Sequence, residues 1–371
     1  MQTTIIRHKG RLPGLDHLRA AAIIMVFFYH YGRLFPSPSW ISTVSEFGWT
    51  GVDLFFVLSG YLIAYELFGQ VKEQGTISFK RFFIKRAFRI LPAYLLVTGI
   101  YFLFPVTHER GTLAPLYKYL TFIQNIGLDI LHQSTFSHAW SLCIEEQFYL
   151  VLPIILYTLN RFRLWKKSVL LVVAVFIAGI LVRTMAWKYV FSLPKDQIGK
   201  WYEFIYYPTY SRLDGLLAGV SIAAFGTFKP DLVVKVLTYK SYILLCAGIV
   251  LLAAYFICTD QTSFSASVWG FPLVAAGYAF CVFYNLQVPQ RKDGLLSKVL
   301  QQIAELSYAI YLTHKIVIHL TQQILSQTGI IADSNAMVLL CIGVSVITAY
   351  IVNRCVERPF LQVRKHFWPN L

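Results

Sequence analysis

The sequence predicts an all-α protein: a polytopic membrane bundle of about ten transmembrane helices with both termini in the cytoplasm. First, 57% of the 371 residues are hydrophobic and 14% are charged, whereas a soluble domain is about a quarter charged. Second, the apolar residues form runs that can cross a hydrocarbon core of about 30 Å, which takes about 20 helical residues. Third, the basic residues are concentrated in alternate loops.

Ten apolar runs define the expected spans, which leave little room for anything else. They cover residues 14–36, 48–68, 84–105, 139–160, 168–190, 208–226, 240–258, 266–286, 303–326 and 336–356. The stretch 116–131 is shorter and more polar, so a re-entrant or interfacial helix is expected there and an eleventh span is the less favoured alternative. Residues 1–371 are therefore expected to form a single membrane domain without an appended soluble domain.

The loop charges orient these helices. The alternate loops 1–13, 69–90, 160–168, 227–240, 288–300 and 353–371 contain 23 Lys and Arg residues. The opposite loops 36–48, 105–139, 187–207, 258–268 and 326–336 contain 5. The asymmetry places the first set and both termini in the cytoplasm. The net charge of +15 therefore reflects membrane topology, and no nucleic-acid partner is expected.

The six cysteines lie in or beside apolar runs and include no CxxC pair. They are interpreted as small core residues, so neither a disulfide framework nor a metal site is expected.

The first expected helix contains two polar residues on one face, Arg19 and His30. Eleven residues correspond to about three turns, which places the two about 16 Å apart along the axis. Asp16 lies three residues before Arg19 and is a possible ion-pair partner. The alternative is an arginine that reaches the membrane surface and an unrelated core histidine. Charged groups inside membrane helices usually face a partner or a water-filled cavity.

Further polar residues fall near the outer ends of the second, fourth and sixth expected helices. They share roughly the depth of His30 and comprise Asp53, His138, Trp140, Glu145, Glu146, Arg212 and Asp214. Buried polar residues would scatter in depth by chance, so this shared layer favours an active site. Glu146 is expected to point elsewhere than Glu145, because adjacent helical residues diverge by about 100°.

His30 is the candidate general base, since an imidazole can take a proton from a hydroxyl at neutral pH. A carboxylate on its other ring nitrogen would orient it, and Asp53 and Glu145 both qualify. The alternative for both carboxylates is a structural ion pair with Arg212. Arg212 or the Trp140 indole N–H could stabilise an oxyanion.

Asp214 and His314 are additional substrate-site candidates. His314 lies midway along the ninth expected helix beside Lys315. A hydrogen-bonded core histidine is the alternative interpretation for His314.

The densest basic cluster is SFKRFFIKRAFRILP, where Arg86 and Arg89 share a helix face. Guanidinium groups suit phosphate oxygens, although a basic anchor at the membrane surface is the alternative. The sequence contains neither a P-loop nor the glycine pattern of a dinucleotide-binding fold.

Seven motifs in this order resemble the integral-membrane acyltransferase family 3. They are LDHLRAAAIIMVFFYH, GVDLFFVLSGYLI, RAFRILPAY, WSLCIEEQFYL, YSRLDGLLAG, SYAIYLTH and ERPF. The resemblance implies an acyl-CoA-dependent O-acyltransferase that modifies hydroxyls of glycans, lipid-linked sugars or similar acceptors in the bacterial inner membrane. It implies that His30 is essential, that Arg19, Arg86 and Arg89 handle acyl-CoA, and that Glu145 is a further functional position. No tightly bound cofactor is expected.

Together with the orientation of the helices, the resemblance implies transfer of an acetyl or succinyl group from cytoplasmic acyl-CoA to a hydroxyl near the far face. The competing hypothesis is a transporter or flippase for a glycan or lipid precursor, in which buried charges hold substrate or relay protons. A structural or partner-binding subunit is the third alternative, and it leaves the shared depth of the polar residues unexplained.

Overall fold

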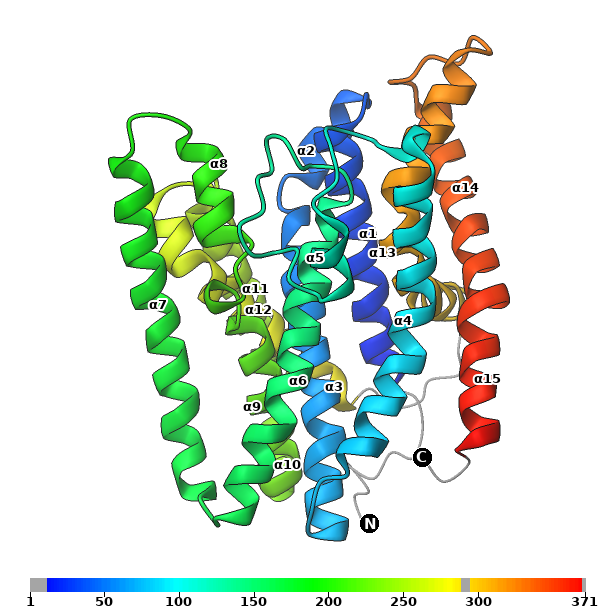
Figure 1. Cartoon of the computed structure of the whole chain (residues 1–371). Coiled ribbons are helices and arrows are strands. Elements are labelled where there is room, and N and C mark those ends of the chain that lie inside the picture. Colours follow the sequence, from blue (N-terminus) through cyan, green and yellow to red (C-terminus); the bar gives the residue numbers. More distant parts are fainter. Residues whose placement is uncertain (1–11, 288–293, 369–371) are drawn as a thin grey trace.

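The computed structural model describes residues 12–287 and 294–368 as a bundle that is 81% helical, with no strand in these ranges (Figure 1). Each of the ten expected spans coincides with a helix. These helices are α1 (Pro13–Leu34), α3 (Gly51–Gln74), α4 (Phe79–Leu103), α6 (Trp140–Arg161), α7 (Ser168–Ser192), α9 (Asp214–Phe228), α11 (Lys240–Ile257), α12 (Phe271–Tyr284), α13 (Leu295–Ser326) and α14 (Asn335–Val352). The shorter helices are α2 (Ser39–Ser45), α5 (Leu116–Leu120), α8 (Gln197–Trp201), α10 (Pro230–Leu237) and α15 (Arg358–Phe367).

Seven helical segments in the described ranges are long and apolar enough to cross a membrane, or eight if α9 and α10, which meet at 107°, form one span. Helices α1 and α13, with 22 and 32 residues, are not among the seven. Both contain polar residues of the site described below. The chain is thus an all-helical, multi-pass membrane protein, while the count of ten crossings and the cytoplasmic side of the termini stay predictions.

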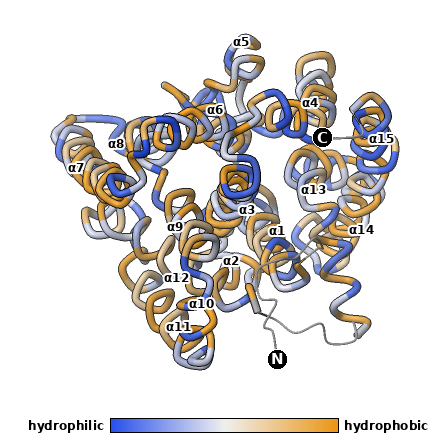
Figure 2. The backbone as a smooth tube through the Cα atoms, turned by 90° about the horizontal axis from the view of Figure 1, so that it is seen from below, coloured by the Kyte–Doolittle hydropathy of each residue, from blue (hydrophilic) through white to orange (hydrophobic). Residues whose placement is uncertain are grey.

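Helix α3 is central and α7 is peripheral, as the view from below shows (Figure 2). In the most apolar part of α3, 72% of the residues are buried inside the protein, compared with 6% in α7. Because lipid is as apolar as a leucine side chain, α7 can leave its surface outside the bundle without penalty. Polar groups carried by α3 and its neighbours are instead enclosed by protein.

The N-terminal end of α1 and the C-terminal end of α15 lie at the same end of the bundle (Figure 1). This arrangement agrees with an even number of crossings. The expected basic loops 1–13, 288–300 and 353–371 lie partly outside the described residues. The opposite end carries the long loop between α4 and α6, which contains α5.

The expectation of a re-entrant or interfacial helix over 116–131 is wrong in extent. Only the five residues of α5 are helical, and turns follow. Phe122 and Gly127 have φ angles of 53° and 60°. These left-handed conformations interrupt a right-handed helix, so the segment becomes a folded loop on the outer end of the bundle.

Candidate active site

A cavity of about 330 Å³ opens among helices α1, α3, α4, α6 and α13. We call it the arginine cavity, because three arginines and three glutamates lie in its wall: Arg19, Arg86, Arg89, Glu66, Glu145 and Glu146. The rest of its wall is formed mainly by apolar and aromatic side chains. Its volume lies at the lower end of the range typical of ligand pockets.

The three arginines differ in their ion pairs. Arg19 bonds Asp16 at 3.3 Å, which confirms the predicted helical pair. Arg86 donates to Glu66 at 3.0 Å, and Lys85 donates to the other oxygen of Glu66 at 2.7 Å. Arg89 is exposed and has no ion pair within 4.0 Å among the described residues. Arg89 therefore offers the cavity a guanidinium whose donors are available to an anion.

Glu145 lies in the arginine cavity, where it accepts a hydrogen bond of 2.7 Å from the Tyr149 hydroxyl. The expectation that Glu146 points elsewhere is wrong, because it lines the same cavity. Unlike Glu145, Glu146 has no hydrogen-bond or ion-pair partner within the described ranges. The cavity therefore contains carboxylates as well as guanidinium groups.

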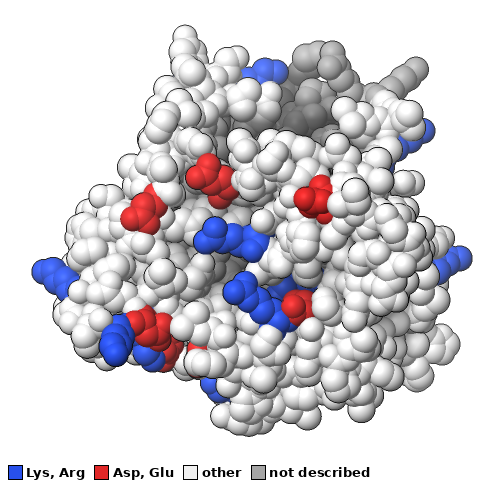
Figure 3. Space-filling view, turned by 90° about the horizontal axis from the view of Figure 1, so that it is seen from above, with Lys and Arg blue, Asp and Glu red and all other residues white. Residues whose placement is uncertain are grey.

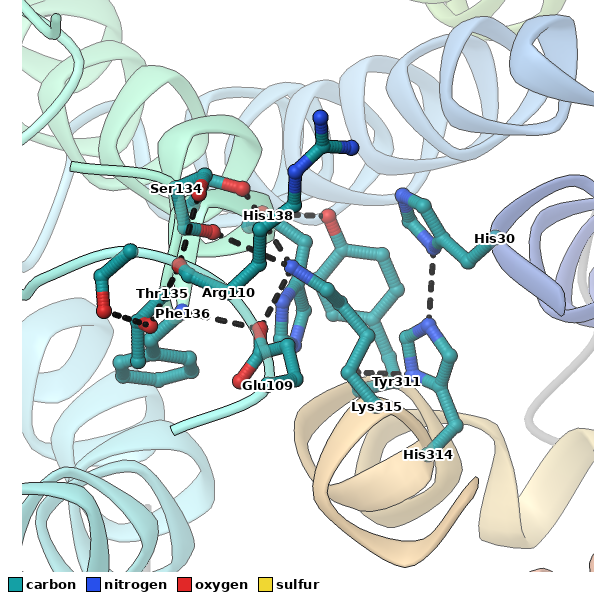
Figure 4. A network of polar contacts seen from close by, with 12 residues as sticks. His30, Glu109, Arg110, Ser134, Thr135, Phe136, His138, Tyr311, His314 and Lys315 are labelled. Carbon is teal, nitrogen blue, oxygen red and sulfur yellow. Dashed lines mark hydrogen bonds and ion pairs between the residues drawn. The ribbon is translucent and has the colours of Figure 1, made fainter. Parts of the chain in front are cut away.

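His30 pairs with a histidine, and the expectation of a carboxylate partner is wrong for the described residues. Its Nδ1 lies 2.8 Å from Nε2 of His314, and the two rings stack at 5.0 Å (Figure 4). Glu145 instead bonds Tyr149, and Asp53 bonds Arg212. Residues 284 positions apart are thus joined by the packing of α1 against α13.

The neighbours of His314 define the protonation of both rings. His314 Nδ1 lies 3.0 Å from the Ile310 carbonyl oxygen and 2.8 Å from that of Tyr311. Because carbonyl oxygens only accept, Nδ1 carries the hydrogen, and Nε2 of the neutral ring accepts from His30 Nδ1. The remaining nitrogen of His30, Nε2, then has a free lone pair, as a general base requires.

Tyr311 connects the arginine cavity to the histidines. It lines the cavity, and its hydroxyl lies 2.6 Å from Ser141 Oγ and donates to the His138 carbonyl oxygen at 2.7 Å. Its ring lies 6.1 Å from that of His314. His30 itself is not a lining residue of the cavity. The hydrogen-bonded pair of Tyr311 and Ser141 thus separates the cavity from the histidines.

His138 is the third member of the histidine cluster, which comprises His30, His138 and His314. Its ring centroid lies 5.9 Å from that of His30 and 5.0 Å from that of His314. The sequence placed His138 in the shared polar layer but assigned it no role. Within the part of the chain that the structure describes, no three His, Cys, Asp or Glu side chains are arranged to hold a metal ion.

A buried ion pair beside the histidine cluster was not expected from the sequence. Lys315 and Glu109 bond at 2.6 Å, and their side chains are almost fully buried (Figure 4). Glu109 also accepts from the Phe136 N–H at 3.1 Å. A lysine inside an apolar run signals a partner, but Glu109 lies in a loop without periodicity and could not have been chosen. The ion pair connects the loop between α4 and α6 to helix α13.

Two further ion pairs form what we call the paired layer. Arg212 donates to Asp53 at 2.8 Å, and Arg183 donates to Asp214 at 2.7 Å. The Arg212 guanidinium lies 5.2 Å from the Trp140 ring and 4.1 Å from the Phe271 ring. Arg212, Asp53, Asp214 and Trp140 therefore lie together as the depth argument predicted. The structural alternative foreseen for Asp53, an ion pair with Arg212, is the observed arrangement.

Charged side chains also appear on the face seen from above, where Lys, Arg, Asp and Glu surround a recessed area near the middle (Figure 3). This is the end of the bundle that carries the long loop between α4 and α6. The histidine cluster lies beneath part of this loop, because the loop supplies Glu109 and leads into His138. The bundle thus has polar groups at both of its ends.

A bundle of apolar helices that encloses arginines, glutamates and histidines is typical of integral membrane enzymes and transporters. Comparison with known proteins distinguishes between these classes. Residues 12–354 match the family described as "Acyltransferase domain", and the chain belongs to this acyltransferase family. It is therefore a multi-pass membrane member of this acyltransferase family.

Two relatives illustrate this membership. "Putative O-acetyltransferase SACOL0978" from Staphylococcus aureus (strain COL) is 30% identical over 338 residues, which cover 83% of this chain and 50% of the relative. "O-acetyltransferase OatA" from Staphylococcus aureus (strain NCTC 8325 / PS 47) is 27% identical over 328 residues, which cover 82% and 50%. This chain thus spans about half the length of the relatives it matches. No solved structure matches it.

Proposed function

We propose that this protein transfers a short acyl group, acetyl or succinyl, from acyl-CoA to a hydroxyl of a glycan or lipid-linked sugar, with His30 as general base. The observation that carries the proposal is the hydrogen bond of 2.8 Å between His30 and His314, which leaves His30 Nε2 free to accept a proton. The names of the relatives, O-acetyltransferases, favour an acetyl group. By the positive-inside rule the arginine cavity faces the cytoplasm, and a bacterial inner membrane is proposed because the relatives are bacterial.

The arginine cavity has the charge needed to bind acyl-CoA, the acyl donor. Acyl-CoA is an anion, and guanidinium groups bind phosphate oxygens with paired hydrogen bonds. Arg89 lacks an ion pair among the described residues, while Arg19 and Arg86 share the cavity wall with it. The rise of about 16 Å between Arg19 and His30 along α1 is similar to the length of an extended pantetheine arm. The thioester reaches His30 when the Tyr311 side chain turns aside.

The reaction then follows as acyl transfer. His30 Nε2 takes the proton of the acceptor hydroxyl as its oxygen attacks the thioester carbonyl carbon. A carbon–oxygen bond forms, and the carbon–sulfur bond breaks. The thiolate of CoA leaves with the bonding electrons and receives the proton from His30. The products are an ester and CoA, and the charge that forms on His30 is shared with His314.

The proposal is tested with purified protein in lipid vesicles, radiolabelled acetyl-CoA or succinyl-CoA, and a glycan acceptor. His30→Ala is expected to lower kcat about 10²- to 10⁴-fold, because a general base contributes that much. His17→Ala is the matched control, since His17 lies on the same helix and bonds Ser297. Turnover in folded His30→Ala protein equal to wild type would remove His30 from the mechanism. Movement of substrate without label on the acceptor would instead indicate a transporter.

A further inference from the structure

His138 is a buried histidine that the mechanism above does not use. It belongs to a short turn of helix, Ser137–Ala139, directly before α6. It is only 2% exposed, and neither ring nitrogen has a hydrogen-bond partner among the described residues. A buried donor or acceptor without a partner costs about 1–3 kcal/mol. A protein retains such a group at this cost where water or a ligand satisfies it or where it takes part in catalysis.

The nearest cation does not satisfy His138, because its hydrogen bonds are already used. Lys315 Nζ bonds Glu109 at 2.6 Å, the Ser134 carbonyl oxygen at 3.4 Å and Ser137 Oγ at 3.4 Å. An ammonium group has three donors, so these three contacts account for all of them. Lys315 thus holds the chain on both sides of Phe136, through the Ser134 carbonyl and the Ser137 hydroxyl, and donates no hydrogen bond to the His138 ring (Figure 4).

The position of the His138 ring is defined from several sides. Its backbone carbonyl accepts from Tyr311, and its ring packs edge-on against Phe136 at 5.2 Å. The ring lies 5.5 Å from Tyr311, which lines the arginine cavity, and 5.9 Å from His30. His138 thus adjoins both the residue at the end of the donor cavity and the proposed base. A thioester carbonyl that enters from the cavity beside Tyr311 and binds at His30 is thereby brought close to this ring.

We propose that His138 is a further catalytic residue whose ring N–H donates a hydrogen bond to the thioester carbonyl oxygen as that oxygen gains negative charge. This inference rests on the proposed function. No bond of His138 forms or breaks, since it only stabilises the tetrahedral intermediate. A single donor of this kind contributes about 10²- to 10³-fold to kcat.

The sequence suggested Arg212 or the Trp140 indole for this task. Arg212 is 1% exposed, bonds Asp53 and lies against the ring of Trp140. Its guanidinium is thus committed to the paired layer. Arg212 Nε and the His138 ring both lack a hydrogen-bond partner among the described residues, but His138 lies beside His30 and His314, whereas Arg212 is paired with Asp53. The oxyanion donor is therefore assigned to His138.

The test compares His138→Gln with His138→Met, two variants with side chains of similar length and flexibility. Glutamine supplies an N–H, whereas methionine has no donor. With acetyl-CoA and the same glycan acceptor in vesicles, His138→Met is expected to lose about 10²-fold or more in kcat. His138→Gln should retain at least about tenfold more activity than His138→Met, with similar KM values for both substrates and similar thermal unfolding.

Three outcomes contradict the assignment to His138. Equal kcat values for the two folded variants would show that the donor is not needed, and so would wild-type activity in His138→Met. Loss of folded protein in both variants would assign His138 to packing. In each case label transfer by the wild type would leave the proposed function intact. Absence of label transfer by the wild type would remove the proposed function itself.

Discussion

The paired layer and the histidine cluster are both buried in the bundle, yet they satisfy their polar groups differently. In the paired layer each aspartate has an arginine within 2.8 Å, and the guanidinium of Arg212 is packed against aromatic rings. In the histidine cluster His30 has one free ring nitrogen, and His138 has two nitrogens without partners among the described residues. Asp53 Oδ2, Arg183 Nε and Arg212 Nε also lack a hydrogen-bond partner among the described residues, but each of these charges is neutralised by an ion pair. Paired charges hold helices together, whereas ring nitrogens without a charged or hydrogen-bonded partner are available to a substrate.

The arginine cavity is intermediate between these regions. Lys85 and Arg86 share one carboxylate, while Arg89 and Glu146 have no ion pair within the described ranges. The comparison therefore predicts that variants of the paired layer change stability, that variants of the histidine cluster change kcat, and that variants of the cavity change the KM for the donor.

The largest effect is expected from Arg212→Met, which leaves the Asp53 carboxylate buried without its cation. Breaking a buried ion pair in this way costs about 3–5 kcal/mol in the free energy of unfolding. Thermal or denaturant unfolding of the purified protein measures it. Arg161→Met is the control, because Arg161 is exposed at the end of α6. The double variant Arg212→Met with Asp53→Leu should recover part of the loss, since replacing both charges removes the unpaired carboxylate.

A folded Arg212→Met protein with unchanged unfolding and a large loss of kcat would give the paired layer a direct part in the chemistry. The original expectation for Asp53 as a catalytic carboxylate would then regain support.

An intermediate effect is expected from His314→Phe, which keeps a planar ring but removes the acceptor for His30 Nδ1. His314 acts through His30 and is a positioning residue. A misplaced base costs about 10²-fold in rate, so kcat should fall by about this factor while both KM values stay unchanged. His314→Gln keeps a side-chain oxygen that can accept, and it should restore part of the activity. Steady-state kinetics of the two variants measure kcat and both KM values and so test the positioning role.

His319→Phe serves as the matched control on the same helix, because the described contacts of the histidine cluster do not include His319. Equal losses in His314→Phe and His314→Gln would refute the positioning role. A rise in KM without a change in kcat would do the same.

The smallest effect is expected from the double variant Arg86→Ala and Arg89→Ala. Loss of charged hydrogen bonds to phosphate should raise the KM for acyl-CoA about tenfold, which corresponds to about 1.4 kcal/mol. The KM for the acceptor should stay within about twofold. Kinetics at varied donor and acceptor concentrations measure both values.

Lys166→Ala with Lys167→Ala is the control for this double variant. These two lysines lie on another basic loop and do not line the cavity. An equal change of donor KM in the control would mean that overall charge attracts the donor, and the arginines would then be membrane anchors only.

The sequence alone was sufficient to predict features that depend on interactions within a single helix. A backbone in lipid must satisfy its own hydrogen bonds, so long apolar runs become helices, and all ten expected spans coincide with helices. The Arg19–Asp16 pair follows from spacing of three residues along one helix. The proximity of Asp53, Arg212 and Trp140 agrees with the depth expected from a fixed rise per residue. The same expectation is wrong for Glu145 and Glu146, which line the arginine cavity with Arg19 instead of lying beside His30.

The tertiary structure decided which of these residues meet. Helical periodicity gives depth, but it does not give the rotation of one helix against another, because that depends on the packing of side chains from distant segments. Asp53 therefore forms an ion pair with Arg212, and His30 forms a hydrogen bond with His314, which is 284 residues away in the sequence. Sequence alone determined that these polar groups lie inside the bundle, and packing determined which of them are paired and which remain available to a substrate.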